Sequence, residues 1–261
     1  MSNLLIILIT LVLRLDILWN KLPERPMDMT KAAAVALVDE LDQYYPDSNP
    51  FDPEVYFDSI SGAPPGWIAA TAVQRGFGCT SSMVLNVNLA YETHPFYNTP
   101  LWVSTIAHEL YHVKQGAACL MPEQTVENAA SIASHVALYN AWRDGNSLAY
   151  YGLLYSLRRE FTLAAADLML QEDRDPNELF DRMKLTTSER AYFDKAVSNP
   201  SKLSNQGNLY WTAFATQLLT DEDGVFSNPA YVEEVDTSEL AAWILGLKTN
   251  PRIIRHGRYQ R

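Results

Sequence analysis

Two histidines stand four residues apart, at His108 and His112, and Glu109 directly follows the first of them. Residues four apart lie on one face of an α-helix, so both imidazoles can offer a nitrogen to one metal ion, with Zn²⁺ as the expected ion. Glu109 lies one step around such a helix. From there its carboxylate can take a proton from a metal-activated water without binding the metal itself. The pattern predicts zinc-dependent hydrolysis with Glu109 as the general base.

Hydrophobic spacing predicts the elements that must position this motif. From Met83 to Tyr91 every second residue is apolar and Asn86 and Asn88 point the other way, which predicts a half-buried strand. Thr99 is a suitable N-cap, Pro100 a suitable first helical residue and Gly116 a suitable stop, so the motif should lie in mid-helix. The apolar residues of this helix mark it as facing the core: Leu101, Ile106, Leu110 and Val113.

The strand followed by a helix with His108, Glu109 and His112 resembles the zincin metallopeptidases. The resemblance covers about residues 80 to 135. It implies an α+β fold in which a small sheet is followed by the motif helix and by a mostly α-helical C-terminal half. It also implies a peptide or protein substrate, whose amide bond the site would hydrolyse.

The resemblance also bears on the third zinc ligand, because two histidines are too few to hold the ion. The metzincin subgroup has a glycine and a third histidine where this chain has Gln115 and Ala118, so this subgroup is excluded. The remaining branch uses a glutamate from a later helix. The candidates are Glu123, Glu127 and Glu160.

We expect Glu127 to be the third ligand. Glu127-Asn128-Ala129-Ala130 is similar to the Glu-x-x-Ala pattern of many such enzymes, and the helix that carries it is the next one along the chain. Where several of these families place an acid that orients a metal-bound histidine, this chain has Ser131. His135 is interpreted as a hydrogen-bonded core histidine.

Most of the remaining chain is predicted to be helical. Helices are expected at 30–45, 122–142, 147–171, 187–197, 209–219 and 238–247, and Thr186 with Glu189 should form a capping box. We divide the chain of 261 residues into an apolar segment at 1–29, a zincin-like domain at 30–249 and a basic tail at 250–261.

The N-terminal segment is almost wholly aliphatic from Leu4 to Leu13, and Arg14 and Asp16 follow. Three interpretations stay open: a core or partner-docking helix, which we favour, a membrane-associated helix, or a cleaved signal. Contact with a membrane or a protein assembly would then involve residues 4–19.

The formal net charge of −11 argues against nucleic acid as the main partner. The basic tail from Arg252 to Arg261 is either solvated or docked on an acidic partner. Cys79 and Cys119 do not identify a compartment. A different class of function also stays open: a non-catalytic structural or interaction protein of a larger assembly that retains the zincin fold.

Overall fold

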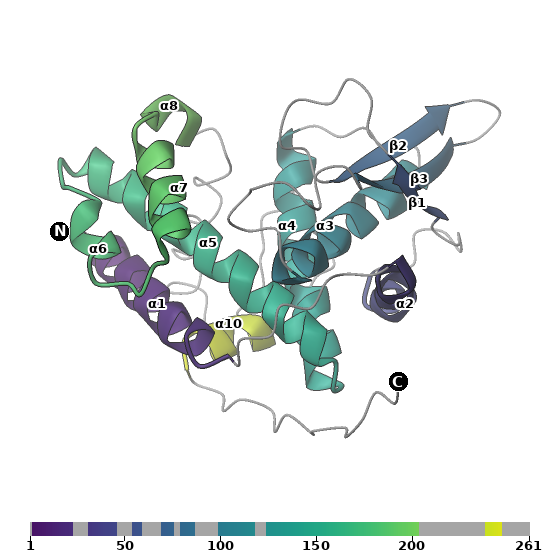
Figure 1. The fold of residues 1–261 in the computed structure, drawn as a ribbon, viewed down its shortest axis with the longest axis horizontal. Helices are drawn as coiled ribbons and strands as arrows, with labels where there is room; N and C mark the ends of the chain where they lie inside the picture. The colour runs from purple at the N-terminus through teal and green to yellow at the C-terminus, as the bar shows by residue number, and fades with distance from the viewer. Residues whose placement is uncertain are drawn as a thin grey trace.

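The computed structural model describes residues 2–22, 31–45, 54–58, 69–75, 79–86, 99–117, 124–203 and 238–246 (Figure 1). Its longer helices are α1 (Asn3–Trp19), α2 (Lys31–Asp42), α3 (Thr99–Ala117), α4 (Gln124–Arg143), α5 (Ser147–Gln171) and α7 (Thr187–Val197). Shorter helices are α6 (Asn177–Phe180), α8 (Pro200–Leu203) and α10 (Ser238–Ile244). The helix expected at 209–219 lies outside the described residues, as does the basic tail.

The fold is mostly helical, and the predicted α+β class with a small sheet is wrong. Of the residues whose side chains the structure describes, 80% are helical and none is in a strand. Three short backbone strands lie beside this helical body: β1 (Glu54–Asp58), β2 (Ala69–Arg75) and β3 (Cys79–Asn86). Their order is β1-β3-β2, with β1 parallel and β2 antiparallel to β3. The alternation at Met83 to Tyr91 indicated extended backbone. It gave no information on how much of the core is formed by helices.

Helix α5 is the element against which the other helices assemble. It packs against α1 on one side and against α3 and α4 on the other (Figure 1). Its buried residues lie all around the helix, including Leu153, Leu154, Leu157 and Phe161. A helix that is apolar on every face is stable only when it is enclosed. At its N-terminus, the side chain of Asn146 accepts a hydrogen bond from the backbone N–H of Ala149 at 3.0 Å.

The helices α3 and α5 approach each other closely at Gly152. A Cβ atom at this position would lie 2.9 Å from Cβ of Val103 and 3.1 Å from the backbone nitrogen of Ser104, with Cγ1 of Val103 closer still. The backbone of α3 cannot move aside without shifting the whole helix. The missing side chain of Gly152 therefore sets the separation between α5 and the helix that carries His108 and His112.

The aliphatic N-terminal residues form α1, which lies along α5 in the core. Its buried face follows helical spacing: Leu5, Leu8, Leu11, Val12 and Leu15. Arg14 of α1 donates a hydrogen bond to the carbonyl of Trp243 in α10 at 3.0 Å. Within the part of the chain that the structure describes, no helix is both long enough and apolar enough to cross a membrane.

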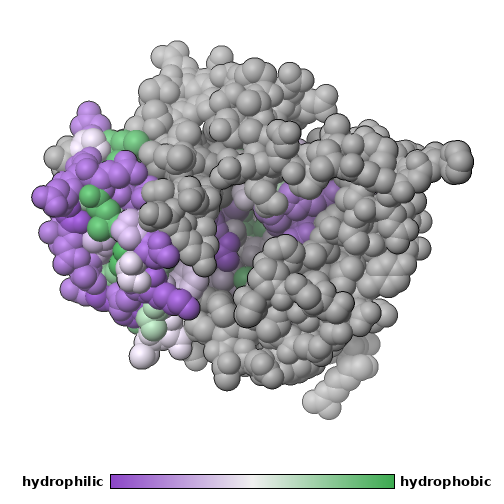
Figure 2. Space-filling model, turned by 90° about the horizontal axis from the view of Figure 1, so that it is seen from above, coloured by the Kyte–Doolittle hydropathy of each residue, from purple (hydrophilic) through white to green (hydrophobic). Residues whose placement is uncertain are grey.

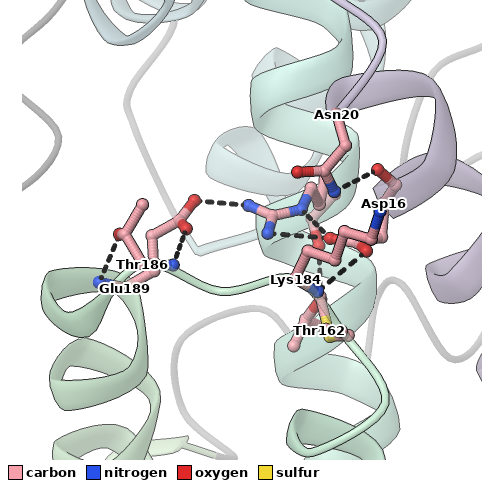
Figure 3. A network of polar contacts seen from close by, with 8 residues as sticks. Asp16, Asn20, Thr162, Lys184, Thr186 and Glu189 are labelled. Atoms are coloured by element: carbon pink, nitrogen blue, oxygen red, sulfur yellow. Dashed lines mark hydrogen bonds and ion pairs between the residues drawn. The ribbon is translucent and has the colours of Figure 1, made fainter.

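A buried ion network joins α1, α5 and α7 (Figure 3). The guanidinium of Arg158, which is only 4% exposed, is 2.9 Å from Oδ1 of Asp16 and 2.6 Å from Oε1 of Glu189. Asp16 also accepts from the backbone N–H of Lys184 at 3.1 Å. Glu189 forms the predicted capping box with Thr186, which is thereby confirmed. Each carboxylate thus neutralises Arg158 and also satisfies a backbone donor.

The surface at this end of the molecule is mostly hydrophilic, with a few hydrophobic residues among the polar ones (Figure 2). Exposed charged residues of α6, α7 and the connecting segment include Glu178, Asp181 and Lys195. Arg190 pairs with Asp181 at 2.6 Å, and the side chain of Asp181 is 69% exposed. The exposed pair of Arg190 and Asp181 therefore serves as a control for the contribution of the buried pair to stability.

We expect Asp16→Asn to lower the free energy of unfolding by about 1.5 to 3 kcal/mol, because it removes one of the two buried carboxylates that pair with Arg158 while Glu189 remains. Asp181→Asn removes an exposed charge of the same type and should cost less than about 1 kcal/mol. Urea unfolding followed by circular dichroism measures both. Equal costs for the two variants would contradict a stabilising role for the buried network.

Candidate metal centre

Helix α3 brings the imidazoles of His108 and His112 together. Their Nε2 atoms are 3.1 Å apart, and the ring centroids are separated by 4.8 Å with an interplanar angle of 74°. Both side chains are half-buried, and so is that of Glu109 between them in sequence. The structure thus places the two predicted histidine ligands on one helix face.

The separation of the two Nε2 atoms fits a shared metal ion. Two nitrogens that bind tetrahedral zinc at about 2.0 to 2.1 Å lie about 3.3 Å from each other. The observed 3.1 Å is close to this value and is also suitable for an N–H···N hydrogen bond between the rings. The rings therefore need little rearrangement to bind an ion.

The opposite face of α3 is fixed by packing. Ile106, Ala107 and Leu110 are fully buried. Behind the motif, the hydroxyl of Tyr45 donates a hydrogen bond to the carbonyl of Ala107 at 2.6 Å. Burial raises the pKa of Tyr45 well above its usual value, and Asp42 and Tyr111 raise it further, so this hydroxyl keeps its proton. These contacts hold the motif helix in a fixed rotation about its axis.

Of the three glutamates that could be the third zinc ligand, the structure describes only one side chain. Glu127 lies near the start of α4, which packs against α3, but its side chain is outside the described residues. Glu123 is outside them altogether. The carboxylate of Glu160 on α5 accepts a hydrogen bond from Nε of Arg159 at 2.8 Å and makes a second contact with its Nη2. Among the side chains that are described, no three His, Cys, Asp or Glu residues gather as a metal site.

His135 on α4 is buried, with 2% of its surface exposed, as expected for a core histidine. Its Nδ1 makes a short hydrogen bond with the carbonyl oxygen of Ser131. Burial lowers the pKa of His135 to about 3; the bond to Ser131 raises it, whereas the nearby charges of His108 and Arg159 lower it.

Arg159 is a residue that sequence reasoning missed. Its guanidinium lies over the ring of Tyr155, 5.5 Å from the centroid, in addition to its contact with Glu160. Burial raises the pKa of Tyr155 to about 12, although Arg159 acts to lower it. These contacts are local to α5, because Tyr155 lies one turn before Arg159 and Glu160 directly follows it.

Comparison of the chain with protein-family models, with curated proteins and with solved structures finds no match. The functional proposal therefore depends on the chemistry and geometry of the His108 and His112 pair.

Proposed function

We propose that this protein is a zinc-dependent hydrolase of peptide bonds, with His108 and His112 as metal ligands and Glu109 as general base. The observation that carries the proposal is the 3.1 Å separation of the two imidazole Nε2 atoms on a helix whose other face is buried. The mostly helical fold provides the support for this site, and the proposal does not depend on a zincin sheet.

Each residue of the motif has a separate role in this proposal. His108 and His112 would hold the ion through neutral imidazole nitrogens. Zinc bound there would polarise the scissile carbonyl and acidify a water molecule. Glu109 accepts the proton of the attacking water and then donates it to the departing amine. Because Glu109 is half-buried, its carboxylate remains accessible from the solvent side.

Glu127 is the third ligand that we propose. A carboxylate beside two neutral histidines leaves a residual positive charge and an open coordination position, which hydrolysis requires. Helix α4 packs against α3, and its buried residues include the small Ala130, Ala133 and Ser134, which permit a close approach. Glu160 is a weaker candidate because Arg159 already engages its carboxylate.

The wild-type chain should bind about one zinc per molecule, and the double variant His108→Ala/His112→Ala should bind none. Glu109→Gln should retain zinc and lose at least about 100-fold in peptidase activity, because the amide cannot accept the proton. Metal analysis and cleavage of a mixed peptide library measure these two properties. Stoichiometric zinc binding by the double variant would contradict the proposed metal site. Zinc binding without any activity sensitive to Glu109 would favour the non-catalytic alternative.

The identity of the third ligand is tested with two matched glutamate variants. We expect Glu127→Gln to weaken zinc binding by at least about 10-fold, since it removes a charged ligand. Glu160→Gln should leave the affinity within about threefold, since this carboxylate pairs with Arg159. Competition with a chelator gives both dissociation constants. The reverse order would assign the third position to Glu160.

A further inference from the structure

Helix α1 packs against α5 and lies at the edge of the helical body (Figure 1). On its outer side, the side chain of Ile6 is 43% exposed and that of Ile17 is 55% exposed. These are the two largest exposed fractions among the big hydrophobic side chains that the structure describes. Single apolar residues are common on protein surfaces, but these two belong to one continuous stripe.

The outer residues of α1 and its C-cap recur at alternating steps of three and four along the chain. We call them the α1 stripe: Asn3, Ile6, Thr10, Leu13, Ile17 and Asn20. Leu13 is half-buried, and the other five are exposed. Alternating steps of three and four are the spacing by which two helices interlock their side chains along a shared seam.

The α1 stripe has no charged residue, although the chain has a net charge of −11. Both charged residues of α1 are engaged within the protein. Arg14 donates to the carbonyl of Trp243, and Asp16 belongs to the buried ion network. The hydroxyl of Thr10 donates to the carbonyl of Ile6 at 2.8 Å, so this donor is already satisfied within the helix. A partner could therefore cover the middle of the stripe without burying a charge or an unpaired hydroxyl.

The sequence of the α1 stripe is nearly the same in both directions. Its matched pairs, from the ends inward, are Asn3 with Asn20, Ile6 with Ile17, and Thr10 with Leu13. A two-fold axis between residues 11 and 12 would place Ile6 of one copy opposite Ile17 of the other, on both sides of the axis. A closed dimer requires such a self-complementary surface, because each contact occurs twice.

Charges beyond the ends of the stripe favour the same antiparallel arrangement. At the start of α1, the carboxylate of Glu172 accepts hydrogen bonds from the backbone N–H of Ser2 at 3.0 and 3.2 Å. Lys21 follows the other end of the helix and is exposed. In an antiparallel pair, Lys21 of each copy comes to the end at which the other copy has Glu172. A parallel pair would instead bring like charges together at both ends and align the two helix dipoles.

We propose that the α1 stripe is the interface of a homodimer, in which two α1 helices pack antiparallel about a two-fold axis. A membrane surface is a poorer occupant, because helices that lie on membranes carry several Lys or Arg beside the apolar face, whereas α1 has only Arg14. One pair of 17-residue helices is a small interface, so we expect a dissociation constant of about 1 to 100 µM. This inference does not depend on the proposed metal site.

Sedimentation equilibrium of the full chain, from about 1 to 500 µM, measures the dissociation constant. Ile17→Glu places a charge against Ile6 of the other copy and should weaken the dimer at least about 10-fold, as should Ile6→Lys. Val35→Glu is the matched control, because Val35 of α2 is 37% exposed and lies outside the stripe. It should leave the dissociation constant within about twofold. Circular dichroism checks that each variant keeps the helical fold.

An equimolar mixture of Ile6→Lys and Ile17→Glu tests the direction of the two helices. In the antiparallel register the new ammonium of one copy faces the new carboxylate of the other, so a heterodimer should form at concentrations at which each variant alone is monomeric. A mixture that stays monomeric would overturn the antiparallel register.

The wild-type chain alone can overturn the dimer. A monomer at about 500 µM, or unchanged dimerisation in both Ile17→Glu and Ile6→Lys, would reject the α1 stripe as the interface. Binding of a monomeric wild type to phosphatidylcholine vesicles, lost in Ile17→Glu, would reject the dimer and assign the stripe to a lipid surface.

Discussion

The guanidinium of Arg158 is buried in the middle of the longest helix, and the arrangement of the neighbouring helices follows from the need to neutralise it. An isolated charge in the protein interior is strongly unfavourable, so the buried guanidinium needs carboxylate partners from neighbouring helices. Asp16 comes from α1 and Glu189 from α7. These two helices are thereby fixed in rotation and in position along α5. The contacts are directional, unlike the apolar packing around them, and they select one register of α1 on α5.

Helix α5 also supports the candidate metal site, through its contact with α3. Gly152 precedes Arg158 by six residues and permits the close approach of Val103 and Ser104 on α3. Tyr45 holds α3 from the side of α2, through its hydrogen bond to Ala107. The two imidazoles consequently extend from a helix that is held on several sides. A site of this kind can bind an ion with little loss of conformational entropy, because the ligands are already close to their final positions.

Local patterns in the sequence predicted local structure well. The expected helix at 147–171 matches α5, and the capping box of Thr186 and Glu189 is present, since both depend only on residues near each other in sequence. The pairing of His108 and His112 was predictable for the same reason. The class of the fold was not, because alternation at Met83 to Tyr91 cannot reveal the balance of helix and sheet. The partners of Arg158 depend on packing between distant helices, and they had no sequence signal. The ligand role of Glu127 stays a prediction.

The proposed function requires that His108 and His112 bind one zinc ion together. X-ray absorption at the zinc edge of the zinc-loaded full chain tests it most directly, because it reports the type and distance of the ligands. We expect a first shell of nitrogen and oxygen at about 2.0 to 2.2 Å, with outer-shell scattering from two imidazole rings. A sulfur shell at about 2.3 Å, which would point to Cys79 or Cys119, or a spectrum without imidazole scattering would contradict it.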